Sequence, residues 1–173
     1  DWCINFINKF NYFIREEYNK SIKIHFYRHA KTNLNDKSFL GQSRNPGIIK
    51  EKKKTILINK SDLVFCSSLK RSLQTSYYYF KNNKIKIDKR LDEINYGNAE
   101  GLMIDEFKIK YSNIYKKWVK GIDTPFPNGE NYLEVSKRIS FFCDDLIKKI
   151  NLHNSNNFII ITHNVVLRTL IGK

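Results

Sequence analysis

Two histidines stand directly after apolar runs, and this placement is the feature of the chain that most directly predicts chemistry. His29 follows the β-like run of residues 22–28, and His163 follows a second run of four apolar residues and a threonine. A third run, residues 63–66, leads into a serine-rich segment that contains Arg71. In open parallel sheets ligands bind outside the carboxyl ends of the strands, so three such ends can share one crevice. The side chains that would meet there indicate a phosphate site: Arg28, His29, Arg71 and His163.

Transfer of a phosphoryl group needs positive charge around the phosphate oxygens, an in-line nucleophile and an acid for the leaving oxygen. His29 can attack phosphorus through a neutral ring nitrogen if its other nitrogen donates a hydrogen bond, for which a backbone carbonyl is the expected acceptor. Arg28, Arg71 and His163 would hold the oxygens, and arginine suits this task because its guanidinium donates two parallel hydrogen bonds. Glu93, in a glycine-containing loop, could protonate the leaving alkoxide and later take a proton from water.

These residues need a sheet that brings strand ends together, and the order of apolar patterns along the chain predicts one. We expect strands near residues 22–28, 63–66, 85–88 and 158–161. We expect helices after Ser68 and over residues 102–120 and 131–150. Alternating strands and helices predict an α/β fold, a three-layer αβα sandwich with a mostly parallel central sheet and right-handed crossovers.

Three local expectations concern the segments around the site. The turn residues of 41–47 should bring backbone N–H groups near a ligand and border the pocket. Ser67 or Ser68 should cap the amino end of the helix that carries Arg71. Glu130 should lie at the start of the following long helix, where a carboxylate complements the positive end of the helix dipole.

Composition favours one folded domain with an appended segment. The chain has 173 residues, of which 41% are hydrophobic, enough for a well-buried core. Residues 2–14 place aromatic and aliphatic side chains at three- and four-residue intervals, as in an amphipathic helix. We therefore divide the chain into residues 1–20, an N-terminal amphipathic helix or the end of a preceding segment, and residues 21–173, the main domain.

The charge balance is strongly basic, with 31 lysines and arginines against 17 acidic residues and a net charge of +14. Such a charge favours polyanions, but the lysines are spread along the whole chain and no nucleic-acid-binding motif accompanies them. We therefore expect no nucleic-acid partner.

Cysteine usage and hydropathy predict a cytoplasmic protein. The three cysteines, Cys3, Cys66 and Cys143, are scattered and form no Cys-x-x-Cys pair, so neither a disulfide framework nor a zinc site is indicated. No apolar run approaches the roughly 20 residues that a membrane span needs, so we expect no membrane association.

Five separated blocks carry recognisable motifs in a fixed order: Arg28–Asn35, Ser67–Thr75, Leu91–Gly101, Pro127–Asn131 and Thr162–Arg168. Together they resemble the histidine phosphatase superfamily, in its phosphoglycerate-mutase-like phosphatase branch. The resemblance implies that His29 is the phosphorylated nucleophile and Glu93 the proton donor and acceptor. It implies that Arg28, Arg71 and His163 form the phosphate pocket, without a metal or organic cofactor. It also implies three substrate or phosphate contacts, Asn35, Gly41 and Gln42.

The chain departs from the family pattern at three positions. Ala30 replaces a glycine, Asn131 a serine, and Asn164 the glycine that usually follows the second histidine. Asn164 would place a side chain beside the pocket, so we count it among the substrate-binding residues. Family members usually continue for another strand beyond Lys173, which predicts that the last strand is missing from this sequence.

The resemblance leaves three functions to weigh. The length and pattern of residues 101–129 resemble α-ribazole phosphatases and broad-specificity phosphomonoesterases, which favours hydrolysis of a small phosphorylated metabolite. A phosphoglycerate-type mutase is the second hypothesis and would require a bisphosphorylated primer. A catalytically silent domain that binds phosphate esters is the third, because the chain begins with Asp1 rather than Met and carries Asn164. The sequence identifies neither the physiological substrate nor the oligomeric state.

Overall fold

The computed structural model describes residues 22–34, 38–50, 59–60, 62–153 and 155–171. The helix predicted at residues 2–14 and the predicted substrate contact Asn35 lie outside these residues.

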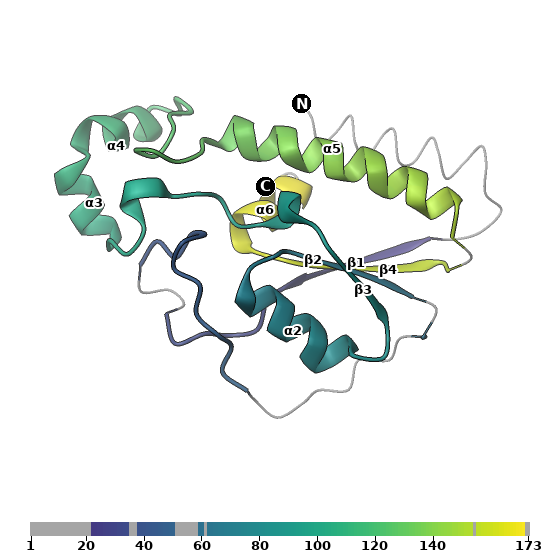
Figure 1. The fold of residues 1–173 in the computed structure, drawn as a ribbon. Helices are drawn as coiled ribbons and strands as arrows, with labels where there is room; N and C mark the ends of the chain where they lie inside the picture. The colour runs from purple at the N-terminus through teal and green to yellow at the C-terminus, as the bar shows by residue number, and fades with distance from the viewer. Residues whose placement is uncertain (1–21, 35–37, 51–58, 61, 154, 172–173) are drawn as a thin grey trace.

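A four-stranded parallel sheet forms the centre of the molecule (Figure 1). Its strands are β1 (Lys23–Arg28), β2 (Leu63–Cys66), β3 (Lys84–Ile87) and β4 (Asn157–Thr162), arranged in the order β1-β4-β2-β3. The four predicted strands are therefore confirmed to within about a residue at each end.

The register of the sheet aligns the strand ends that carry the predicted site. Arg28 pairs with Thr162 across β1 and β4, and Cys66 pairs with Ile161 across β2 and β4. The residues that follow these three strands therefore leave the sheet at nearly the same level. In a parallel sheet, crossover connections make every strand run in the same direction, so all carboxyl ends lie at one edge of the sheet.

Helices cover both faces of the sheet, which confirms the predicted αβα sandwich. Helices α5 (Tyr132–Asn151) and α6 (Asn164–Ile171) lie over one face, and α2 (Lys70–Phe80) lies over the other (Figure 1). Side chains alternate along a strand, so Phe158 and Ile160 join the core on one face while Ile159 and Ile161 join the core on the other. A sheet buried on both faces explains why β4 reads as an unbroken apolar run.

The helix predicted over residues 102–120 is two helices, α3 (Ile104–Lys110) and α4 (Ser112–Val119), with the break at Tyr111. Figure 1 shows them beyond the edge of the three layers. The break folds α4 back on α3, so that the ring of Trp118 stacks on Phe107 with centroids 4.8 Å apart. Phe107 is fully buried in this arrangement, which compensates for the interrupted helix.

The N-cap predicted for α2 is wrong, whereas Glu130 lies at the start of α5 as predicted, one residue before the N-cap. Leu69 is the N-cap of α2, because the hydroxyls of Ser67 and Ser68 donate to Asp92 instead. At α5 the N-cap is Asn131, whose side chain accepts a hydrogen bond from the Glu134 backbone N–H while the Glu134 carboxylate accepts from that of Asn131. This capping box suits asparagine as well as serine, so the departure from the family pattern at Asn131 keeps the helix start intact.

Two short 3₁₀ turns, η1 (Lys89–Leu91) and η2 (Gly97–Ala99), flank the loop that carries Glu93. The two cysteines within the described ranges, Cys66 and Cys143, are buried and form no disulfide bond with each other. In the same ranges, every helix is too short or too polar to cross a membrane.

Candidate functional site

The carboxyl ends of β1 and β4 bring the two predicted histidines together. The backbone N–H of His29 donates to the carbonyl of Thr162 at 2.9 Å, and the rings of His29 and His163 lie 5.0 Å apart between centroids. Arg71, in the first turn of α2, donates from Nε to Nδ1 of His163 at 3.3 Å. His29 is 5% exposed and the other two side chains are fully buried. The predicted convergence of these three residues is confirmed.

The ring of His29 is held in one tautomer. Its Nδ1 lies 2.7 Å from the carbonyl oxygen of Ala30, and a carbonyl can only accept, so Nδ1 carries the hydrogen and Nε2 the lone pair. Burial lowers the pKa of His29 to about 4, and the positive charges of Arg71 and Arg28 act in the same direction. The imidazole is therefore neutral near pH 7. The expectation of a backbone carbonyl as the partner is confirmed.

His163 has protein partners on both ring nitrogens. Its Nε2 lies 2.7 Å from the Ser67 hydroxyl, which itself donates to Asp92 at 2.8 Å. Nε2 must therefore donate to the hydroxyl, while Nδ1 accepts from Arg71. Burial and the neighbouring Arg71 hold the pKa of His163 well below its usual range. His163 lies behind His29 and orients Arg71, and it is not among the residues that line the cavity described below.

Sequence reasoning missed Ser67 and Asp92 as parts of the site. The available signals were weak: a serine directly after the buried strand β2, and an aspartate one residue before Glu93. Both residues are buried, and Asp92 accepts hydrogen bonds from the Ser68 backbone N–H at 2.7 Å and from both serine hydroxyls. Asp92 thus orients the Ser67 hydroxyl, which accepts the hydrogen bond from Nε2 of His163.

The guanidinium of Arg71 also reaches the loop that follows Leu40. It donates to the carbonyl of Gly41 at 2.7 Å and to that of Arg44 at 3.4 Å. Gly41 has a φ of +59°, a conformation that favours glycine, and a Cβ there would lie 2.0 Å from the carboxylate of Glu100.

Glu100 holds that loop in place. Its carboxylate accepts hydrogen bonds from three successive backbone N–H groups, those of Gln42 at 2.7 Å, Ser43 at 2.8 Å and Arg44 at 3.1 Å. The prediction that these N–H groups face a ligand is therefore wrong, because a protein carboxylate occupies them. The loop instead contacts Arg71 through the carbonyls of Gly41 and Arg44.

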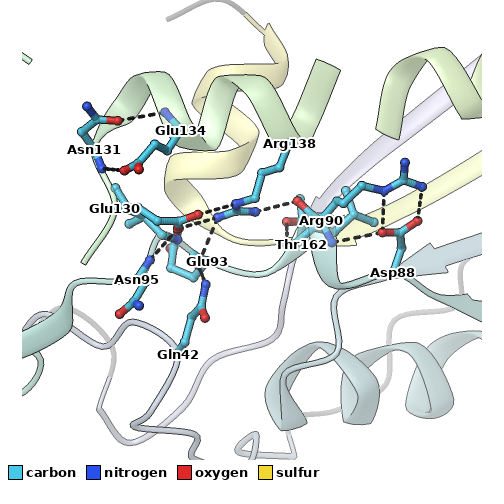
Figure 2. A network of polar contacts seen from close by, with 12 residues as sticks. Gln42, Asp88, Arg90, Glu93, Asn95, Glu130, Asn131, Glu134, Arg138 and Thr162 are labelled. Carbon is cyan, nitrogen blue, oxygen red and sulfur yellow. Dashed lines mark hydrogen bonds and ion pairs between the residues drawn. The ribbon is translucent and has the colours of Figure 1, made fainter. Parts of the chain in front are cut away.

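Glu93 is 7% exposed and fixed through both its side chain and its backbone. Its Oε1 accepts from the backbone N–H groups of Ile94 at 3.1 Å and Val165 at 3.2 Å. Its carbonyl accepts from Gln42 Nε2 at 2.7 Å and from Arg138 at 3.3 Å, as Figure 2 shows. Burial raises the pKa of this carboxyl, which keeps it protonated to a higher pH than an exposed glutamate.

Arg138 links Glu93 to the start of α5 (Figure 2). Its guanidinium pairs with Glu130 through Nε at 2.9 Å and through a second nitrogen at 3.1 Å, and it donates to the Arg90 carbonyl at 2.6 Å. Glu130 also accepts from the Asn95 backbone N–H at 2.8 Å. Glu130 therefore fixes the loop of Glu93, and its expected interaction with the helix dipole stays a prediction.

A cavity of about 280 Å³ opens beside these groups. Arg28 at the exposed end of β1, His29, Arg71, Glu93 and Asn164 border it. The remaining lining residues are Leu34, Ser38, Phe39, Leu40, Tyr96, Met103 and Ile104. Neither Gly41 nor Gln42 lines the cavity, and their roles as substrate contacts stay predictions.

The cavity combines a neutral imidazole, two guanidinium groups and a buried carboxyl with a raised pKa. Such groups are required to bind a tetrahedral anion and to transfer it to a ring nitrogen. Within the described residues, no three His, Cys, Asp or Glu side chains are grouped so that they could hold a metal ion.

Comparison with known proteins gives a consistent result. The family model described as the histidine phosphatase superfamily (branch 1) matches residues 24–173. Phosphoserine phosphatase 1 of Hydrogenobacter thermophilus is 25% identical over 112 residues, which are 63% of this chain and 52% of that protein. The chain thus spans about half the length of this curated relative.

Solved structures of similar fold include both phosphatases and mutases. The α-ribazole phosphatase from Shigella flexneri superposes with a TM-score of 0.69 at 22% identity, over 86% of this chain and 77% of that one. A phosphoglycerate mutase from Bacillus anthracis has a TM-score of 0.63 at 18% identity, over the same shares of 86% and 77%. At these identities the likeness establishes the phosphoglycerate-mutase-like fold and does not distinguish the two activities.

Proposed function

Because the chain belongs to the histidine phosphatase superfamily, branch 1, we propose that it is a metal-independent phosphomonoesterase that acts through a phosphohistidine at His29. The observation that carries this proposal is the hydrogen bond from His29 Nδ1 to the Ala30 carbonyl, which leaves the lone pair on Nε2. A nucleophilic imidazole must be neutral, and the lowered pKa of His29 meets that requirement near pH 7.

In the first step, Arg28 and Arg71 bind the phosphate oxygens of the ester. Nε2 of His29 attacks phosphorus in line with the ester oxygen, so that a P–N bond forms while the P–O ester bond breaks. Glu93, protonated because burial raises its pKa, gives its proton to the leaving alkoxide. The products of this step are the free alcohol and a phosphohistidine.

In the second step, the Glu93 carboxylate takes a proton from water, and the resulting hydroxide attacks phosphorus. The P–N bond breaks, inorganic phosphate leaves, and His29 returns to its neutral form. His163 acts here through Arg71, because its Nδ1 accepts from the guanidinium and orients it toward the phosphate. His163 is in this respect a positioning residue.

Hydrolysis is preferred over mutase chemistry because this mechanism needs no second phosphate site. The cationic side chains among the described lining residues are Arg28 and Arg71, and apart from His29 and Glu93 the other described lining residues are apolar or uncharged. The cytoplasmic location and the division of the chain at residue 21 stay predictions.

Release of phosphate from a small aryl phosphate, measured with a chelator present, tests the proposal. The wild-type protein should hydrolyse the aryl phosphate, and a His29→Ala protein of confirmed folding should not. His25→Ala is a matched control, since His25 lies on β1, the strand that precedes His29, stacks on Tyr27 and does not line the cavity. Full activity of His29→Ala would overturn the proposal, and phosphate transfer to a second alcohol that depends on a bisphosphorylated primer would favour the mutase.

A further inference from the structure

The described lining of the cavity beside His29 consists of two kinds of residue. Four belong to the proposed mechanism, Arg28, His29, Arg71 and Glu93, and most of the others are aliphatic or aromatic. The aliphatic and aromatic side chains are Leu34, Phe39, Leu40, Tyr96, Met103 and Ile104. We propose, resting on the proposed function, that these six side chains form a leaving-group subsite and that the enzyme prefers phosphate monoesters of compact apolar or aromatic alcohols.

The rim of this leaving-group subsite is formed by two large apolar side chains that face solvent. Met103 and Ile104 are 48% and 46% exposed at the start of α3. Single exposed apolar residues are ordinary on protein surfaces, but these two are adjacent and border the same cavity. The backbone N–H of Met103 donates to the Glu106 carboxylate at 2.7 Å, which holds the rim in position. An apolar leaving group would remove both side chains from water.

Two lining residues of the subsite, Phe39 and Tyr96, belong to a packed cluster of aromatic rings. The ring of Phe39 lies 4.9 Å from that of Tyr96, 5.4 Å from that of Phe107 and 5.6 Å from that of Phe126, between centroids. Burial and the charge of Glu93 raise the pKa of Tyr96, so its phenol stays neutral. Such neutral, packed rings favour binding of an aliphatic or aromatic ligand group, because ring contacts add binding free energy and the site need not be reordered.

The same lining disfavours leaving groups that carry a charge. Beyond the catalytic groups, the polar groups among the described lining residues are Ser38, Asn164 and the phenol of Tyr96, all uncharged. A second phosphate, a carboxylate or an ammonium on the leaving group would lose water against the apolar side chains, and the described lining offers it no ionic partner besides the catalytic groups. The cavity of about 280 Å³ lies just below the roughly 300–1,000 Å³ typical of ligand sites, which favours compact esters.

The test compares benzyl phosphate with phosphoserine, both esters of primary alcohols, so that leaving-group chemistry differs little. We expect kcat/KM for benzyl phosphate to exceed that for phosphoserine about 10-fold or more, the scale on which apolar pockets discriminate. Met103→Ser and Ile104→Ser should each lower the ratio of the two kcat/KM values several-fold, mainly through KM for benzyl phosphate. Ile109→Ser is the matched control, because Ile109 is 83% exposed on the same helix and does not line the cavity.

A ratio near one in the wild type, or a ratio that the rim variants leave unchanged, would overturn the leaving-group subsite while hydrolysis itself stands. Binding of benzylphosphonate, measured by calorimetry, provides a readout that needs no turnover. A further outcome is that the wild type hydrolyses neither ester and still binds benzylphosphonate more tightly than Met103→Ser does. In that case the proposed function fails and the subsite stands. Equal binding by wild type and both rim variants overturns the subsite in either case.

Discussion

Two side chains of the site carry pKa values displaced in opposite directions, and this displacement supports the roles that we propose for them. His29 has a pKa lowered to about 4, and Glu93 has a raised one, in both cases chiefly because of burial. The proposed nucleophile, His29, is thus neutral near pH 7, and the proposed acid, Glu93, keeps its proton to a higher pH than an exposed glutamate does. Separated values of this kind are a usual sign of paired nucleophile and acid.

Glu93→Gln should lower kcat about 10²–10⁴-fold, the contribution that a positioned acid and base supplies. Glutamine keeps the size and can still accept hydrogen bonds from the Ile94 and Val165 backbone N–H groups, so the fold should persist. In the wild type, activity should fall as pH rises through the raised pKa of Glu93. That alkaline decline should be absent in the variant.

Profiles of kcat against pH for both proteins check this prediction. Ionisation of the substrate phosphate is common to both, so the difference between the profiles isolates the carboxyl. An identical alkaline decline in Glu93→Gln would show that another group supplies the proton.

The loop of residues 41–44 is the element that joins Glu100 to Arg71. Glu100 accepts from three backbone N–H groups of the loop, and the loop carbonyls of Gly41 and Arg44 accept from Arg71. Glu100 does not line the cavity, so we expect it to act on catalysis through Arg71, by holding the loop and by its negative charge near the guanidinium.

Glu100→Gln should therefore lower kcat/KM by at least about 10-fold and also lower the melting temperature. Hydrogen bonds to a charged acceptor contribute about 1.5–3 kcal/mol each, and the neutral amide weakens several of them at once. Asp105→Asn serves as the control, because Asp105 is exposed and pairs with Lys108. Unchanged activity in a Glu100→Gln protein with reduced stability would mean that the loop does not position Arg71.

Elements with strong apolar patterns were predictable from the sequence. Features fixed by side-chain contacts between separate elements were not. The strands β2 and β4 are buried on both faces, so each appears in the sequence as a continuous apolar run. The N-cap of α2 was missed because Ser67 and Ser68 bond to Asp92, far along the chain. The helix break at Tyr111 was missed because it depends on the stacking of Trp118 on Phe107.

The same distinction holds within the site. Residue types and strand ends predicted that His29, Arg71 and His163 would meet, because topology alone brings them together. The partners of His163 could not be predicted, since the direction of an imidazole depends on the Ser67 hydroxyl beside it. Tertiary contacts, and not local sequence, decide such orientations.

At the scale of the whole molecule, the lowered pKa of His29 makes folding sensitive to acid. The unfolded chain binds a proton at His29 below about pH 6.5, whereas the folded protein binds it only near about pH 4. The unfolded state therefore binds more protons in this window, and stability falls as the pH falls through it. The buried His163, whose pKa is also lowered, acts in the same direction, and the raised pKa of Glu93 acts in the opposite one.

Between about pH 7 and about pH 4.5, the wild type should lose about 2–3 kcal/mol more unfolding free energy than His29→Gln, which has no titrating group at this position. Denaturant unfolding at the two pH values measures the difference, and the other titrating groups cancel in the comparison. Equal losses in the two proteins would mean that the folded environment does not depress the pKa of His29.

A covalent phosphohistidine at His29 is the central claim, and trapping it is the most direct measurement. Wild-type protein mixed with an ester carrying radiolabelled phosphate and quenched within the first turnover should carry label that is stable in base and lost in acid. The label should lie in the peptide that contains His29, and His29→Ala should carry none. Label on another residue, or label retained by His29→Ala, would contradict the mechanism.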